Sequence, residues 1–197
     1  MSREDKAAIA RELKTQAIIL GGFVAIFWIL EIADLAFFRG RLNLYGIAPR
    51  TTIGLRGILF APFLHANLPH VVANTVPFLV LGWLIMLREI SDFFIVTAAS
   101  MLVGGLGVWL FGAPNSIHIG ASGVIFGYLG FLLLRGFFER SAIAVILSLI
   151  VCFFYGGVLW GVLPSRVGIS WEGHLFGLIG GVIAARILAK SKQRSPG

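Results

Sequence analysis

The chain has 197 residues, which is enough for one domain. Hydrophobic residues make up 58% of it and Asp, Glu, Lys and Arg only 13%, whereas a soluble domain carries about 25% charged residues. This composition excludes a soluble enzyme, a disordered tail and a disulfide-stapled secreted module, and the mean hydropathy of +0.93 agrees. The net charge of +7 fits basic residues at the inner face of a membrane better than a nucleic-acid surface. The sequence therefore predicts an integral membrane protein with an all-α fold.

Apolar runs of the length of a membrane span recur along the chain. A bilayer core of about 30 Å needs roughly 20 apolar residues in a helix. The region 93–134 has no formal charge and is twice that length, so it must turn back once, and Gly112-Ala113-Pro114-Asn115 has the turn residues for this. We expect six spans in one domain, at 16–37, 69–87, 92–111, 120–136, 142–162 and 170–188.

The segment 38–68 between the first two spans is mixed in character. It holds four arginines and a partly apolar stretch, 53–64, that is too short and too broken to span. We expect it to lie in the membrane interface or to pack on the bundle. Glu31 and Asp34 fall near the outer end of the first span, where we expect their carboxylates to be solvated.

The distribution of Lys and Arg predicts the orientation. With a cytoplasmic N-terminus, eleven basic residues lie inside and five outside, namely the four loop arginines and Arg166. Both ends are then cytoplasmic, with 1–15 an N-terminal segment, 16–188 the membrane domain and 189–197 a basic tail. The acidic residues Glu4, Asp5 and Glu12 argue against an organellar targeting segment. A prokaryotic plasma membrane is the expected location.

Polar residues on three predicted spans lie at one depth. The second, fourth and sixth spans run in the same direction, and His70 with Asn74, Ser122 and His174 each lie about one turn from their outer ends. Taken singly, Ser122 could bond its own helix, each histidine could bond a carbonyl, and Asn74 could join two helices. Burying all of them in one layer is costly, so their agreement in depth indicates a site.

Small residues would let two of these spans pack closely. Gly123, Gly127 and Gly130 share one face of the fourth span, and Gly177 and Gly181 follow His174 on the sixth. If these faces meet, Ser122 and His174 come within hydrogen-bond distance. A serine hydroxyl becomes a nucleophile when an adjacent base takes its proton, and histidine is the usual base.

The remaining parts of such a site can be sought nearby. Glu172 points away from His174 on a helix, so we expect a Ser–His dyad rather than a triad. The backbone N–H groups of Ala121 and Ser122 begin a helix and can donate to an oxyanion. His70 and Asn74, at i and i+4, can add side-chain donors from one face of the second span.

These elements resemble the rhomboid family of intramembrane serine proteases. Gly120-Ala121-Ser122-Gly123 resembles its Gly-x-Ser-Gly motif, His70-x-x-x-Asn74 its second-helix element, and Gly173-His174-Leu175-Phe176-Gly177 its last-helix histidine with the following glycines. The resemblance covers residues 16–188. It implies a six-helix rhomboid-like bundle with a membrane-associated first loop.

The resemblance also implies roles. Ser122 would be the nucleophile, His174 the general base, and Asn74 and His70 the side chains of the oxyanion hole beside the amides of Ser122 and Ala121. The fifth span and the loop after it would be a gate for substrate helices. Site support would come from Gly120, Gly123, Phe126, Gly127 and Gly177.

Two positions depart from the family pattern. Phe126 stands where the family often has a tyrosine that packs on the histidine, so the ring is kept and the hydroxyl is lost. Leu55-Arg56-Gly57 stands near the place of the family's Trp-Arg pair in the first loop.

Three functions are compared on these grounds. The first is a serine endopeptidase that cleaves transmembrane helices of other proteins, with the bilayer as its setting. The second is a catalytically silent rhomboid-like protein that binds such helices. The third is a transporter or a metal site built from the four histidines His65, His70, His118 and His174, which lacks an H-E-x-x-H motif. We expect the protease, with no metal, cofactor or nucleic acid, and interpret His65 and His118 as interfacial or loop-structuring. The oligomeric state has no signal in the sequence.

Overall fold

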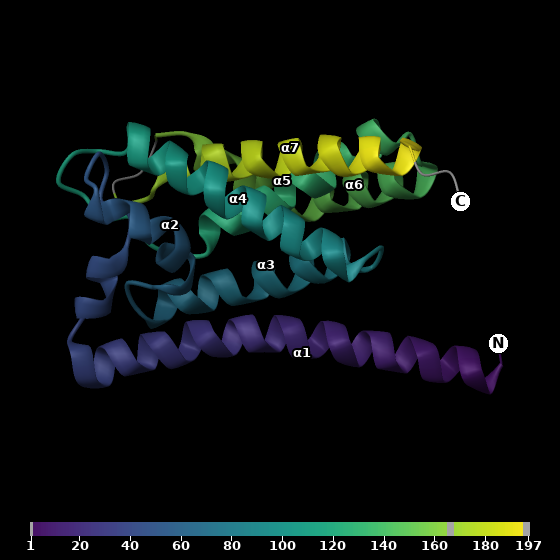
Figure 1. Ribbon diagram of the computed structural model, residues 1–197, viewed down its shortest axis with the longest axis horizontal. Helices are drawn as coiled ribbons and strands as arrows, with labels where there is room; N and C mark the ends of the chain where they lie inside the picture. Colours follow the sequence, from purple (N-terminus) through teal and green to yellow (C-terminus); the bar gives the residue numbers. More distant parts are fainter. Residues whose placement is uncertain (1, 165–167, 195–197) are drawn as a thin grey trace.

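A computed structural model describes residues 2–164 and 168–194, and six of the helices in these ranges are long and apolar enough to cross a membrane (Figure 1). This confirms the all-α bundle with six predicted spans. The long helices are α1 (Arg3–Ala33, continued by a π-helical turn over Asp34–Phe38), α3 (Leu68–Met86), α4 (Ile90–Phe111), α5 (Ser122–Glu139), α6 (Ala142–Tyr155, continued by the 3-10 segment η5, Gly156–Val162) and α7 (Trp171–Arg194).

The helices at the two ends of the chain are longer than the predicted spans. α1 already begins at Arg3, because the Ser2 hydroxyl accepts the N–H of Asp5 at 3.0 Å while the Asp5 carboxylate accepts the N–H of Ser2. α7 likewise continues to Arg194. No change of backbone structure therefore marks the predicted boundaries at 15 and 189. Arg166 and residues 195–197 lie outside the described ranges.

The segment between α1 and α3 packs on the bundle as a chain of short helices. These are η2 (Arg41–Tyr45), η3 (Ile53–Arg56), α2 (Gly57–Phe60) and η4 (Ala61–Phe63). Ile58 of α2 packs against Gly105 of α4. A methyl group added at Gly105 would lie 3.0 Å from the side chain of Ile58. Two arginines hold the segment through backbone carbonyls: Arg50 donates to Leu110 and Gly112, and Arg56 donates to Leu44.

The two acidic residues at the end of α1 are buried, so the prediction that they are solvated was wrong. Glu31 is 3% and Asp34 4% exposed. The Asp34 carboxylate accepts the backbone N–H of Leu42 at 3.0 Å. The turn after α1 brings the loop back over this face of the helix, which a reading of linear hydropathy cannot show.

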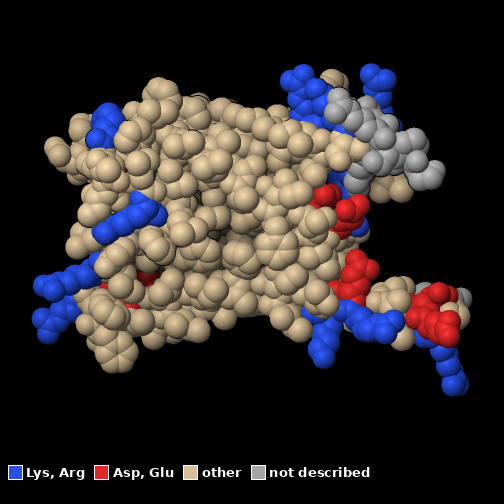
Figure 2. Space-filling model, in the orientation of Figure 1, with Lys and Arg blue, Asp and Glu red and all other residues tan. Residues whose placement is uncertain are grey.

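Helix α5 forms the centre of the molecule. It contacts α3, α4, α6 and α7, with its most extensive contact on α7, and most of its side chains are buried. α1 lies at the periphery against α3, and α6 packs mainly on α5 and is the least buried span (Figure 1). On the face shown in Figure 2, charged side chains are confined to the two ends and a broad uncharged band lies between them, as expected for a protein that spans a bilayer.

Candidate active site

The site begins with a backbone-to-backbone contact between α5 and α7. A methyl group at Gly177 would lie 2.0 Å from the carbonyl oxygen of Gly123, and one at Gly181 would lie 1.8 Å from that of Gly127. No larger residue fits at either α7 position without separating the helices. The glycine faces of the two helices therefore meet, and the first turns of α5 and α7 are brought side by side.

This contact places Ser122 and His174 in hydrogen-bond distance. The Nε2 atom of His174 lies 2.8 Å from the Oγ atom of Ser122, and its Nδ1 atom lies 2.9 Å from the carbonyl oxygen of Gly161 in η5. A carbonyl oxygen can only accept, so Nδ1 carries the proton and Nε2 accepts the Ser122 hydroxyl. Both ring nitrogens are thereby engaged, and Glu172 does not occupy the place of a third triad member.

An aromatic ring fixes the plane of the histidine. The rings of Phe126 and His174 are stacked, with centroids 4.2 Å apart and planes 8° from parallel. Phe126 thus packs where the family's tyrosine would, without a hydroxyl. His174 is 8% exposed, whereas Ser122 is partly exposed.

Gly161 is a residue of this site that the sequence reasoning missed. Besides its carbonyl contact, a methyl group at Gly161 would lie 2.8 Å from the Cζ atom of Phe126 and 3.3 Å from Nδ1 of His174. The lack of a side chain lets η5 approach both rings. The only sequence signal is one glycine among several between 156 and 168, so the contact could not be singled out.

Two further predicted residues converge on Gly120, immediately before the helix that starts at Ser122. Gly120 has a φ of 114°, which favours glycine, and a methyl group there would lie 2.8 Å from Nε2 of His70 and 3.9 Å from Nδ2 of Asn74. Its N–H donates to the carbonyl of Ala61, whereas the first-turn N–H groups of α5 have no acceptor within the helix. The side chains of His70 and Asn74 therefore lie against the residue that stands two positions before Ser122.

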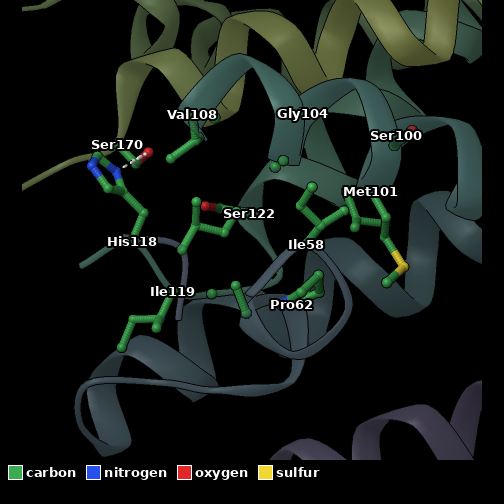
Figure 3. A pocket seen from close by; sticks show the side chains of 17 residues that line it. Ile58, Pro62, Ser100, Met101, Gly104, Val108, His118, Ile119, Ser122 and Ser170 are labelled. Atoms are coloured by element: carbon green, nitrogen blue, oxygen red, sulfur yellow. Dashed lines mark hydrogen bonds between the residues drawn. The ribbon is translucent and has the colours of Figure 1, made fainter. Parts of the chain in front are cut away.

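A cavity of about 50 Å³ adjoins Ser122. Figure 3 shows Ser122 among the side chains that line it, with Val108 and Gly104 of α4, Ile58 and Pro62 of the first loop, and the His118–Ser170 hydrogen bond at one side. Hydroxyls of Ser100, Ser122 and Ser170 are among its polar groups. A cavity of this size with hydroxyl groups in its otherwise largely apolar lining has room for water.

His118 and His65 lie outside the Ser122–His174 pair. His118 contacts the hydroxyl of Ser170 through Nδ1 at 2.6 Å and that of Ser116 through Nε2 at 2.7 Å, which ties the loop before α5 to the start of α7. Burial lowers the pKa of His118. These two hydrogen bonds of His118 hold the loop before α5 against the start of α7.

His65 is fully buried against the rings of Phe27 and His70. Neither of its nitrogens has a hydrogen-bond partner in the described part of the chain, although the Phe63 carbonyl lies near the ring. Burial lowers the pKa of His65 to about 4, with the charge of His70 acting in the same direction. Within the described residues no group of three or more His, Cys, Asp or Glu side chains is arranged to hold a metal ion.

Together these features define a helical membrane protein with a serine–histidine pair at one end of its central helix contact. The sequence pattern of the Rhomboid domain matches residues 54–191, which include His70, Ser122 and His174. The chain belongs to the rhomboid family.

The chain is similar to proteins of several bacteria, one of which carries the family name. An uncharacterized protein of Mycobacterium tuberculosis (strain H37Rv) is 45% identical over 181 residues, which cover 88% of this chain and 75% of the relative. An uncharacterized protein of Mycobacterium leprae is 46% identical over 88% of this chain and 71% of its own length. YdcA of Bacillus subtilis, which is provisionally named a rhomboid protease, is 30% identical over 66% of each chain.

Proposed function

We propose that the chain is an intramembrane serine endopeptidase in which Ser122 is the nucleophile and His174 the general base. The observation that carries the proposal is the 2.8 Å contact between Nε2 of His174 and Oγ of Ser122, with Nδ1 held by Gly161 in the tautomer that leaves Nε2 as acceptor. A helix-binding protein without catalysis has no need for a histidine held in this tautomer beside a serine hydroxyl.

The reaction proceeds in two proton-balanced stages. His174 takes the hydroxyl proton as Ser122 Oγ bonds to the carbonyl carbon of the scissile peptide, and the carbonyl oxygen becomes an oxyanion. The imidazolium then gives its proton to the leaving amine as the C–N bond breaks, which leaves an ester on Ser122. Water then attacks the ester carbonyl while His174 takes a proton from it. The imidazolium returns this proton to Oγ of Ser122 as the ester C–O bond breaks, which releases the acid product and regenerates Ser122.

The oxyanion is stabilised by the donors around Gly120. The N–H groups of Ala121 and Ser122 lie at the positive end of the α5 dipole, and the Asn74 amide and the His70 ring approach from α3. One hydrogen of the Asn74 amide donates to the carbonyl of His70 at 3.1 Å. Its second hydrogen is free to donate to the oxyanion. Gly120, Gly123, Phe126, Gly127 and Gly177 support this arrangement through packing.

The substrates are membrane proteins with a transmembrane helix that is accessible from the bilayer. Backbone inside a regular helix is shielded by its own hydrogen bonds, so the cleaved peptide bond belongs to a helix end that unwinds near Ser122. The distribution of basic residues supports cytoplasmic termini, with the site near the outer face of a prokaryotic plasma membrane. Such a helix enters past α6, because α6 is the least buried span and its continuation η5 contacts His174.

A fluorophosphonate probe separates a working nucleophile from a silent one. The purified protein in detergent is treated with the probe, digested, and searched by mass spectrometry for the phosphonyl adduct. We expect the adduct on Ser122, and a loss of at least tenfold in labelling for His174→Gln, because the serine then has no base. Equal labelling of both proteins, or labelling elsewhere only, would favour the silent helix-binding alternative.

A further inference from the structure

Three basic side chains line one pocket at the end of the bundle opposite Ser122. The pocket has a volume of about 350 Å³ and lies between the C-terminal ends of α5 and α7. Its walls are Phe137, Phe138 and Ala189, and its cations are Arg140, Arg186 and Lys190. In Figure 2, blue side chains gather at this end of the molecule.

The neighbouring acid is already engaged. Glu139, next to Arg140 in the chain, accepts hydrogen bonds from Arg88 and Arg135. The pocket lining contains no carboxylate, and no ion pair is formed by its three cations within the described residues. Arg186 and Lys190 stand at i and i+4 on α7, an arrangement in which like charges repel. Within the described residues, the pocket thus carries a charge of +3 that no carboxylate neutralises.

The backbone conformation at Arg140 is one that favours glycine. Arg140 ends α5 in the left-handed region, with a φ of 52°, and its N–H donates to the carbonyl of Gly136. Glycine is the usual residue at this position because it adopts the conformation without strain. An arginine here is the poorer choice for the backbone, so its replacement with glycine would remove one cation and relieve the backbone.

We propose that this pocket binds the phosphate headgroup of an anionic phospholipid from the adjoining leaflet. The three cations bind the phosphate, and the exposed Phe137 and its neighbour Phe138 contact the glycerol and upper acyl carbons. Basic pockets between spanning helices are the recognised form of such sites. Because α5 carries Ser122 and α7 carries His174, the lipid bridges the far ends of the two helices whose contact aligns the pair.

The test uses the full chain in nanodiscs of phosphatidylcholine, with or without one fifth phosphatidylglycerol. Lipid retained by the protein is measured by native mass spectrometry, and the thermal midpoint is measured in both compositions. The pocket variant is Arg140→Gln/Arg186→Gln/Lys190→Gln. The control is Arg3→Gln/Arg11→Gln/Lys14→Gln, which removes the same residue types from exposed positions of α1 at the same end.

For the wild type and the control we expect at least fivefold enrichment of phosphatidylglycerol and a midpoint rise of about 3 °C. The pocket variant should lose both. Equal loss in the control would show attraction by surface charge alone and overturn the site, as would unchanged enrichment in the pocket variant. A matching rise with inorganic phosphate in phosphatidylcholine discs would overturn the assignment to lipid.

A single substitution keeps the test valid if the triple variant does not fold. Arg140→Gly removes one cation and relieves the left-handed backbone. We expect it to be at least as stable as the wild type in phosphatidylcholine and to gain less from phosphatidylglycerol. An undiminished gain would contradict the proposal. Because the readouts are lipid retention and stability, the result does not depend on whether the chain is a protease.

Discussion

At the scale of single residues, His174 is oriented without a carboxylate. A backbone carbonyl from η5 holds Nδ1 and a stacked phenylalanine holds the plane of the ring. A carbonyl sets the tautomer as a carboxylate would, but it adds less negative charge beside the imidazolium. The position of η5 therefore decides whether the histidine is correctly aligned.

Substitution of Gly161 tests this alignment. Gly161→Ala places a methyl group 2.8 Å from Phe126 and 3.3 Å from His174, so the ring must move away from Ser122. We expect turnover to fall tenfold or more, as misplacement by about 1 Å does in enzymes, with an unchanged thermal midpoint. Gly157→Ala is the control, since nothing lies within 4 Å of its added methyl. Equal activities for the two variants would show that η5 does not position the histidine.

The lowered pKa of His65 predicts how the stability of the protein depends on pH. Its pKa in the folded protein is about 4, below the 6.5 of a free histidine, so the neutral form is favoured by folding. The contribution of His65 to the free energy of unfolding is complete above pH 6.5 and is lost as the pH falls toward 4. At pH 5 the folded state is less stable by about 2 kcal/mol on this account.

Removal of the titrating group tests that sign. His65→Phe keeps a ring against Phe27 and discards two nitrogens that have no partner in the described residues. We expect a thermal midpoint at pH 7 equal to or above that of the wild type, and a smaller decline between pH 7 and pH 5. A decline as steep as that of the wild type would assign the acid sensitivity to other groups.

The sequence predicted those residues of the site that act through a reactive or polar side chain. Ser122 and His174 could be paired from the sequence because each follows the start of a span and precedes glycines on one helix face. Gly161 could not, because it acts through its backbone. Glu31 and Asp34 were placed in solvent because the fold of the first loop over α1 depends on tertiary contacts.

At the scale of elements, the contact between α5 and α7 is the structural basis of the pair. Gly181→Ala would place a methyl group 1.8 Å from the carbonyl oxygen of Gly127, so the helices must separate. We expect a loss of about 1–3 kcal/mol in stability and a loss of probe labelling at Ser122, read from thermal unfolding and mass spectrometry.

The control for this substitution is a glycine outside the α5–α7 contact. Nothing lies within 4 Å of a methyl group at Gly22, in the interior of α1, so Gly22→Ala should leave labelling unchanged and stability unchanged or about 0.5–1 kcal/mol higher. Equal labelling of Ser122 in Gly181→Ala and Gly22→Ala would mean that the distance between α5 and α7 does not control the reactivity of Ser122.

Hydropathy predicted the six spanning helices, but it did not predict the residues at which they begin and end. Six spans are visible as apolar runs, whereas α1 extends through polar residues because Ser2 and Asp5 cap it. The fifth span changes to a 3-10 helix at Gly156-Gly157, where two glycines weaken the α-helix. That change is what brings Gly161 to His174.

At the scale of the whole molecule, the arrangement of charge predicts the topology. The start of α1 and the end of α7 lie at the same end of the bundle, opposite the Ser122 end (Figure 1). With eleven of sixteen basic residues assigned to that end, we expect both termini in the cytoplasm. Fusions of green fluorescent protein to either terminus should fluoresce, and fusions of alkaline phosphatase should be inactive. Active phosphatase at either terminus would reverse the orientation.

The most direct test of the central claim is cleavage of a fluorogenic transmembrane reporter by the purified protein in detergent. We compare the wild type with Ser122→Ala and His174→Ala, both of which should unfold at the temperature of the wild type. We predict cleavage by the wild type and none above background by either variant. Equal cleavage by all three proteins would come from a contaminant and contradict catalysis by the Ser122–His174 pair.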